Sequence, residues 1–284
     1  MTDRRFLAAN GRVALAGLQG QVAADRFVEA VPMTLTACAF LRSEPDGARD
    51  RQMLIGDRFD VLEAEGDHAF GVSAKDGYVG YLPRTALGGF REATHWVSVL
   101  LTHAWAAASI KSEPVEFVPM TAGVQVLGEV SDWFEVALCE GTGFVPRRHL
   151  SPFGQWSDSV VDVARTFEGT PYVWAGNEPS GIDCSGLVQV AFRACGFSCP
   201  PDSDVQAEMA GQRLGATDAL EAGDLVFWAG HVAIASGQGT IVHANAHHMA
   251  VVEEPFPKAE ARIAKSDTGP VTSRLRPNWA ALKL

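Results

Sequence analysis

Cys184 lies where a cysteine side chain can act as a nucleophile. It belongs to segment 181–186, with the sequence GIDCSG, and the apolar residues that follow recur at three- and four-residue spacing, which predicts an amphipathic helix beginning near Cys184. Because a helix N-terminus favours negative charge, we expect it to lower the pKa of this thiol. A lone cysteine is often a small buried apolar residue, but Asp183 and Ser185 are poor core neighbours, which favours the nucleophile.

Two histidines on neighbouring strands are the candidates for the base. Short apolar runs predict three strands, over residues 224–228, 231–236 and 240–244. A hairpin centred on Gly237 would place His231 directly opposite His243 on one face, with Cβ atoms about 4.5–5.5 Å apart. The second imidazole would then fix the tautomer and orientation of the first, as the acid does in a Ser-His-Asp triad.

Two other uses of these histidines remain open at this point. A histidine on an apolar strand is commonly a hydrogen-bonded core residue, and His243 forms a histidine-rich stretch with His247 and His248 that would suit a metal. No set of Asp, Glu or Cys with zinc-ligand spacing accompanies this stretch. We therefore expect catalysis without a metal or any other cofactor.

The composition is that of a globular protein. The chain has 284 residues, of which 47% are hydrophobic, and its formal net charge of -11 argues against a nucleic acid or an anionic membrane as a partner. No apolar run approaches the roughly 20 residues of a membrane span, and the N-terminus lacks the continuous apolar stretch of a secretory signal. Five scattered cysteines are typical of a reducing compartment. We therefore expect a cytoplasmic protein without membrane or nucleic-acid partners; the sequence does not indicate protein partners.

An internal repeat precedes the catalytic candidates. Segments 80–84 (GYLPR) and 143–147 (GFVPR) share the order glycine, aromatic, apolar, proline, arginine, and each follows short alternating runs that are typical of small antiparallel β-domains. This ending resembles the closing strands of bacterial SH3-like barrels. Helical periodicity over 157–167 and at Cys184, followed by strands, predicts an α+β domain. The expected organisation is a lead segment 1–29 with a short helix around 21–30, SH3-like domains 30–90 and 94–152, and a catalytic domain 153–284.

These motifs, in this order, resemble the NlpC/P60 cysteine peptidases. The matching segments are 171–176 (PYVWAG), 183–186 (DCSG), 223–228 (GDLVFW), 231–234 (HVAI) and 241–243 (IVH). The resemblance implies a papain-like α+β fold that cleaves bacterial cell-wall peptides, with Cys184 as nucleophile, His231 as base and His243 as the orienting third residue. It also implies that the Tyr172 hydroxyl helps to hold the oxyanion; packing beside Trp174 is the alternative role.

With its two upstream SH3-like repeats, the sequence resembles one branch of this family. That branch hydrolyses free murein tripeptides and tetrapeptides that begin with L-Ala-γ-D-Glu. In that branch an SH3-like domain blocks one end of the cleft, so that the substrate needs a free amine. The resemblance implies that Asp183 and Ser185 hold the N-terminal alanine, that Tyr78 reaches into the site, that Ser203 contacts substrate and that Asp50 binds the amine.

Ordinary roles are open to several of these residues. Asp183 can cap the helix, which is worth about 1 kcal/mol, Tyr78 can be a barrel aromatic, and Asp50 can lie on a solvated strand edge. A desolvated ammonium group needs a carboxylate and further acceptors, so Asp183 can serve as cap and ligand together. The sequence departs from the family's usual pattern at Ala175, Pro201 and Gly230. These departures bear on fine specificity rather than on the reaction class.

The sequence therefore predicts a cysteine endopeptidase that hydrolyses the γ-D-glutamyl-L-diamino acid bond of free murein peptides during cell-wall recycling. Two alternatives stay open. The chain would be a hydrolase of intact peptidoglycan if the SH3-like repeats anchor it to the polymer. It would be a murein-peptide-binding module without catalysis if the cleft only holds fragments.

Overall fold

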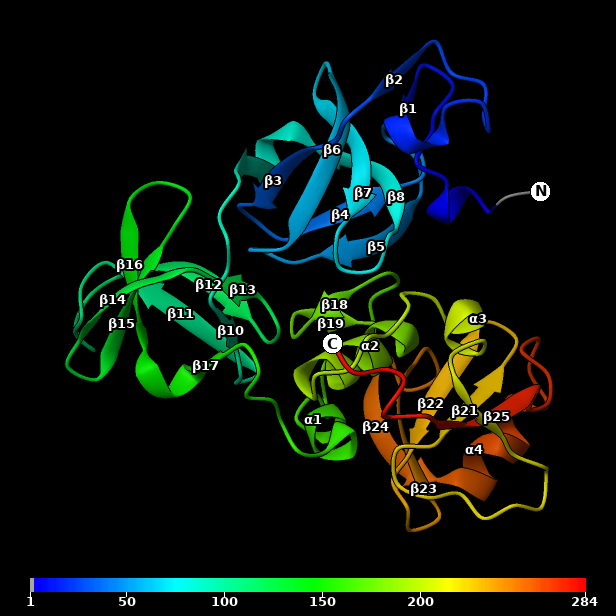
Figure 1. Cartoon of the computed structure of the whole chain (residues 1–284). Helices are drawn as coiled ribbons and strands as arrows, with labels where there is room; N and C mark the ends of the chain where they lie inside the picture. Colours follow the sequence, from blue (N-terminus) through cyan, green and yellow to red (C-terminus); the bar gives the residue numbers. More distant parts are fainter. Residues whose placement is uncertain (1–2) are drawn as a thin grey trace. The chain divides into compact units, whose positions relative to one another are not determined.

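The computed structural model describes residues 3–284 and divides into two compact units, Met1–Leu150 and Ser151–Leu284 (Figure 1). Strands make up nearly all of the regular structure in the first unit, whereas the α-helices belong to the second (Figure 1). Within residues 3–284, no helix has the length and apolar character that a membrane span requires.

The first unit contains a seven-stranded antiparallel sheet with the order β5-β4-β8-β7-β6-β3-β9. Its strands are β3 (Val31–Leu35), β4 (Ala39–Arg42), β5 (Arg49–Met53), β6 (Arg58–Glu65), β7 (His68–Ser73), β8 (Val79–Pro83) and β9 (Leu87–Gly89). Buried side chains such as Leu41, Met53 and Phe59 form one hydrophobic cluster inside it. The alternation of buried and exposed positions along the sequence therefore produced a sheet closed around its own core.

The lead segment differs from the prediction. It contains η1 (Arg4–Phe6), β1 (Val13–Leu15), η2 (Ala16–Leu18) and β2 (Arg26–Val28), with β1 and β2 paired in parallel. The helix predicted around 21–30 is therefore wrong. The guanidinium groups of Arg12 and Arg26 lie 2.7 Å and 2.5 Å from the carboxylate of Glu63, so ion pairs to the barrel hold this segment extended.

A second group of strands closes the first unit. A five-stranded sheet has the order β12-β11-β16-β15-β14, and a three-stranded sheet has the order β13-β10-β17. The strands are β10 (His95–Val97), β11 (Leu101–Trp105), β12 (Pro114–Pro119), β13 (Gly123–Val124), β14 (Val126–Val130), β15 (Trp133–Ala137), β16 (Thr142–Pro146) and β17 (Leu150–Pro152).

Both groups of strands end in the same way, which accounts for the repeated sequence. In the first group β8 leads through η3 (Arg84–Ala86) into β9, and in the second β16 leads through η4 (Arg147–His149) into β17. Pro83 and Pro146 precede these 3-10 turns with φ of -63° and -55°. Since proline is restricted to φ near −65°, it predisposes the chain to this turn.

The second unit is an α+β fold, as predicted. It contains α1 (Val160–Arg165), β18 (Asn177–Glu178), β19 (Gly181–Ile182), α2 (Cys184–Ala194), α3 (Ser203–Gln206), β20 (Gly211–Arg213), β21 (Leu225–Trp228), β22 (His231–Ala235), β23 (Thr240–Asn245), β24 (Ala250–Pro255), α4 (Phe256–Ile263) and β25 (Ser273–Pro277). The antiparallel sheet has the order β20-β25-β21-β22-β23-β24. Helices α1 and α2 pack on each other and on β22.

Candidate active site

Cys184 is the first residue of α2, and Asp183 caps this helix. One Asp183 carboxylate oxygen, Oδ1, accepts hydrogen bonds from the Gly186 N–H at 2.7 Å and from the Ser185 hydroxyl at 3.0 Å. The other oxygen, Oδ2, accepts a hydrogen bond from the Ala175 N–H at 2.8 Å. The predicted helix start and the predicted cap are both confirmed.

The thiol itself is buried, with 7% of Cys184 exposed. The pKa of Cys184 is raised to about 12, mainly by burial and also by the nearby Asp183 carboxylate, while the backbone N–H groups of Val232, Ser185 and Cys184 hydrogen-bond to the sulfur and oppose the shift. The expected decrease of this pKa is therefore wrong. Desolvation penalises the charged form more than the helix N-terminus favours it, so the thiol depends on a base to release its proton.

His231, the predicted base, contacts a second histidine. Nε2 of His231 lies 2.8 Å from Nδ1 of His243, and the ring centroids are 5.1 Å apart. His243 is fully buried at 0% exposure. The structure therefore brings together the two imidazoles that the sequence predicted as base and orienting residue.

The register of the hairpin differs from the predicted one. Strands β22 and β23 pair Ile234 with Val242 and Ala235 with Ile241, which centres the hairpin on residue 238 and not on Gly237. Moving the centre by one residue moves each partner by two, so His243 stays on the predicted face and lies diagonal to His231. Diagonal neighbours lie within reach of aromatic side chains.

Two residues behind His243 were missed by the sequence reasoning. Nε2 of His243 lies 2.9 Å from Oε1 of Glu254, and the Arg262 guanidinium donates to both oxygens of that carboxylate at 2.5 Å and 2.7 Å. The signal was the alternation of β24: His243 pairs with Val252, so Glu254 follows two positions along on the same face.

Burial and hydrogen bonding set the pKa values of His231, His243 and Glu254. The pKa of His231 is lowered to about 3, mainly by burial and also by His243 and Arg262, while Glu254 opposes the decrease. Burial also lowers the pKa of His243, against the opposing effect of Glu254. Burial works to raise the pKa of Glu254, but hydrogen bonds from Arg262 and His243 outweigh it and hold this pKa well below its usual range. The histidines are therefore neutral and the carboxylate is ionised near pH 7.

Tyr172 and His231 line a cavity of about 310 Å³ in the second unit. Burial raises the pKa of the Tyr172 hydroxyl, and charge on Cys184 and Asp183 raises it further, which places this hydroxyl in the surroundings of both residues. A phenol with a raised pKa keeps its proton and can donate a hydrogen bond.

Ser203 is the first residue of α3, the short helix that follows α2. Gln206 of the same helix is fully buried and donates from Nε2 to the Ser185 carbonyl at 2.9 Å. This hydrogen bond ties α3 to the first turn of α2. The substrate contact predicted for Ser203 stays a prediction.

Tyr78 and Asp50 belong to the first unit. Tyr78 is 2% exposed, and its ring meets that of Phe6 edge-on with centroids 5.8 Å apart. Asp50 accepts hydrogen bonds from the Arg4 guanidinium at 2.8 Å and 2.9 Å. The substrate roles predicted for Tyr78 and Asp50 stay predictions.

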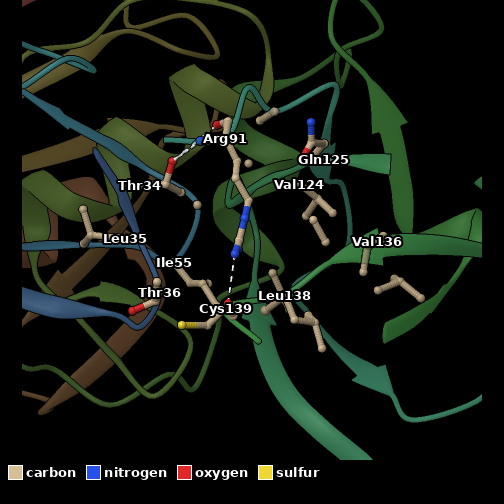
Figure 2. Close-up of a pocket in the computed structure, with 16 residues that line it drawn as sticks. Thr34, Leu35, Thr36, Ile55, Arg91, Val124, Gln125, Val136, Leu138 and Cys139 are labelled. Carbon is tan, nitrogen blue, oxygen red and sulfur yellow. Dashed lines mark hydrogen bonds between the residues drawn. The ribbon is translucent and has the colours of Figure 1, made fainter. Parts of the chain in front are cut away.

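A different pocket lies between the two groups of strands of the first unit (Figure 2). Figure 2 shows Arg91 crossing it, with its backbone N–H donating to the Thr34 hydroxyl at 2.8 Å and its Nη2 donating to the Cys139 carbonyl at 2.9 Å. The cavity measures about 50 Å³, whereas small-molecule sites occupy about 300–1,000 Å³. Its arginine therefore links two segments of the fold, and the pocket has no apparent role in catalysis.

Residues 3–284 contain no cluster of three or more His, Cys, Asp or Glu side chains placed to hold a metal ion. All five cysteines lie in this described part of the chain, and none of them forms a disulfide.

Comparisons with known proteins agree with this geometry. Residues 169–264, which contain Cys184, His231 and His243, match the NlpC/P60 family. The second unit is an NlpC/P60 domain. This family is one of cysteine peptidases, as the resemblance in sequence implied. In the first unit, residues 41–87 match the bacterial dipeptidyl-peptidase Sh3 domain, which confirms the SH3-like domain upstream of the NlpC/P60 unit.

Individual relatives are also named as peptidases or as members of the NlpC/P60 family. The gamma-D-glutamyl-L-lysine dipeptidyl-peptidase of Bacillus subtilis (strain 168) is 28% identical over 218 residues, which cover 70% of this chain and 73% of that protein. A protein of Corynebacterium glutamicum (strain R) named "Probable endopeptidase" is 42% identical over 97 residues, and the match spans only 45% of its length. A crystal structure of an NlpC/P60 family protein from Bacillus cereus ATCC 10987 superposes with a TM-score of 0.72 at 19% identity, covering 87% of this chain and 99% of that one, which shows a shared fold.

Proposed function

We propose that this protein is a cysteine peptidase that hydrolyses the γ-D-glutamyl-L-diamino acid bond of free murein peptides with an N-terminal L-Ala, in cytoplasmic cell-wall recycling. The observation that supports the reaction class is that Cys184 begins α2, which packs on the strand that carries His231, and that Nε2 of His231 lies 2.8 Å from Nδ1 of His243. The dipeptidyl-peptidase Sh3 domain and the name of the B. subtilis relative support the substrate class.

In the proposed reaction Cys184 attacks the γ-carbonyl of D-Glu while its proton passes to His231. His231 then protonates the leaving amine of the diamino acid, and afterwards takes a proton from the water that hydrolyses the acyl-enzyme. The Tyr172 hydroxyl and the Cys184 N–H hold the negative oxygen that forms on the attacked carbonyl. Such preorganised donors contribute much of the rate in acyl transfer.

Asp183 is the proposed ligand of the substrate amine. Burial raises its pKa even though Gly186, Ser185 and Ala175 donate hydrogen bonds to it. A buried carboxylate of this kind is stabilised when a cation approaches, and an α-ammonium group supplies that charge. Because Asp183 precedes the nucleophile directly, the amine would lie at a set distance from the scissile bond.

Ser185, Ser203, Tyr78 and Asp50 are proposed as further substrate contacts. For these four residues the support is the resemblance to the family branch that acts on free peptides. Tyr78→Phe and Asp50→Asn are expected to raise KM more than they lower kcat, because both side chains would bind substrate without taking part in bond breaking.

The proposal is tested with L-Ala-γ-D-Glu-diaminopimelate and its N-acetylated form. We expect L-Ala-γ-D-Glu to be released from the free-amine peptide only, and Cys184→Ala to abolish this release. Cys139→Ala serves as the control, since Cys139 is exposed in the first unit and its loss should leave turnover unchanged.

Three outcomes would contradict parts of the proposal. Equal cleavage of the acetylated peptide would overturn the requirement for a free amine. Turnover of intact sacculi would favour a hydrolase of the cell wall. Binding of both peptides without cleavage would favour the binding module.

A further inference from the structure

Glu254 and Arg262 form an ion pair next to His243, and neither residue belongs to the two strands that carry the histidines. Glu254 lies on β24 and its side chain is 12% exposed, while Arg262 lies on α4 and grips both carboxylate oxygens. Two parallel N–H···O bonds fix the plane of a carboxylate as well as its distance. The oxygen that meets His243 is therefore fixed by a helix and a strand outside the β22–β23 hairpin.

This pair determines where the protons lie. An ionised carboxylate only accepts hydrogen bonds, so His243 must carry its single proton on Nε2, the atom 2.9 Å from Glu254. Nδ1 of His243 is then an acceptor, and the 2.8 Å contact makes Nε2 of His231 the donor. The neutral ring of His231 is left with an unprotonated Nδ1.

We propose that Glu254, clamped by Arg262, is a positioning residue that keeps a free electron pair on Nδ1 of His231 for the proton of Cys184. The inference rests on the proposed function and extends its catalytic machinery by two residues. In the step concerned the Sγ–H bond of Cys184 breaks, an N–H bond forms at Nδ1 of His231, and the sulfur keeps the electron pair with which it attacks. The Val232 N–H that hydrogen-bonds to this sulfur belongs to the residue after His231, which places the thiol beside the base.

Without Glu254 both histidines can adopt the other tautomer. His243 would then donate from Nδ1 to His231, and the proton of His231 would move to Nδ1, the atom that has to accept from Cys184. A histidine held in the wrong tautomer costs about 10⁴-fold in kcat in a Ser-His-Asp triad. Here the loss is expected to be smaller because His243 remains in place. We expect about 10–100-fold, by analogy with the residues that orient metal-ligating histidines through a hydrogen bond to the other ring nitrogen.

The neighbouring residue provides a matched control. Glu253 also lies on β24 and also receives a forked arginine, with Arg165 donating at 2.9 Å and 3.0 Å and Thr240 donating at 2.5 Å. Alternation along the strand directs Glu253 away from the face of His243. Loss of this carboxylate removes a comparable ion pair and leaves the histidines untouched.

The experiment compares full-length wild type with Glu254→Ala, Glu254→Gln and Glu253→Ala. The measurements are kcat and KM on L-Ala-γ-D-Glu-diaminopimelate, thermal unfolding, and the ¹⁵N chemical shifts of the imidazole nitrogens, which identify the tautomers. We expect Glu254→Ala to lower kcat about 10–100-fold at unchanged KM and to mix the tautomers. Glu254→Gln, which keeps an acceptor, should recover part of the loss, and Glu253→Ala should lower the unfolding temperature while kcat is retained.

Two results would overturn the inference. One is wild-type kcat and unchanged tautomers in Glu254→Ala. The other is an equal loss of kcat in Glu253→Ala and Glu254→Ala with wild-type tautomers in both, which would mean that each carboxylate only stabilises the fold. Wild-type protein that cleaves no peptide would refute the proposed function, and the ¹⁵N spectra would still decide the proton assignment.

Discussion

The burial that raises the pKa of Cys184 to about 12 also lowers the pKa of His231 to about 3. In the free protein near pH 7, the pair therefore rests as a neutral thiol beside a neutral imidazole. A base that is neutral and correctly tautomeric can take the proton when substrate arrives. The two pKa values thus indicate that the free protein does not store Cys184 as a thiolate, so in the proposed reaction the thiolate would form only when substrate is bound.

This resting state can be measured by alkylation. Because the thiol is protonated at neutral pH, the rate at which iodoacetamide modifies Cys184 in the free protein should rise continuously from pH 7 to pH 10, following the thiolate fraction. Mass spectrometry of the peptide that contains Cys184 separates its reaction from that of the exposed Cys139. A rate that has already reached its plateau below pH 7 would show a stored thiolate and contradict the prediction.

At the scale of the element, the first turn of α2 packs closely on the backbone of the loop around Gly176. A Cβ added at Gly186 would lie 2.4 Å from the Gly176 carbonyl oxygen and 3.0 Å from Oδ1 of Asn177. Only a glycine lets the helix that carries Cys184 pack this tightly on the preceding loop. Packing therefore explains why the last position of the DCSG motif, Gly186, is a glycine.

Gly186→Ala tests this explanation. Alanine in a helix is ordinarily about 1 kcal/mol more favourable than glycine, but here we expect the free energy of unfolding to fall by about 1–3 kcal/mol, as for other overpacked sites. The added methyl group would push the first turn of α2 away from the preceding loop. Because this would move Cys184 relative to His231, kcat should fall as well. Urea unfolding measures the first effect. Gly17→Ala is the control, because a Cβ at Gly17 meets nothing within 4 Å; equal stability changes in both variants would contradict the packing account.

At the scale of the whole molecule, ionisable groups that are buried or ion-paired in the folded state make the stability depend on pH. His231 has a pKa of about 3 against an ordinary value of 6.5, and Glu253 one of about 2 against 4.5, the latter mainly through its hydrogen bond from Arg165. Both folded-state values are depressed, so each group contributes stability that is present above its ordinary pKa and is lost as the pH falls. Asp183 acts in the opposite direction, because burial raises its pKa.

We therefore expect the unfolding temperature to fall as the pH is lowered from 7 to 3. The decrease should begin near pH 6.5, where protonation starts to favour the unfolded state of His231, and should steepen below pH 4.5 as Glu253 joins it. Thermal unfolding at successive pH values measures the profile, and Glu253→Gln should flatten it below pH 4.5 only. A profile independent of pH down to 3 would contradict the burial of His231 and the ion pair between Glu253 and Arg165.

Much of the site was predictable because its signals are local. The helix start at Cys184, the cap at Asp183 and the two histidine strands follow from spacing within a few residues, and the match to the NlpC/P60 family covers the same segments. Even the misplaced centre of the hairpin left His231 and His243 on one face, because the side-chain period of a strand is two. The helix expected around 21–30 failed where Glu63, far along the chain, binds Arg12 and Arg26.

The amino-acid sequence is thus sufficient to place Cys184 at a helix start and His231 and His243 on one face of a hairpin, since short-range backbone preferences and side-chain alternation decide both. It does not identify Glu254 and Arg262 as their support, nor the direction of the pKa shift at Cys184. The support requires strand β24 and helix α4 to fold back on the hairpin. The pKa shift is the sum of all the atoms that exclude water from the thiol, and these come together only when the chain is folded.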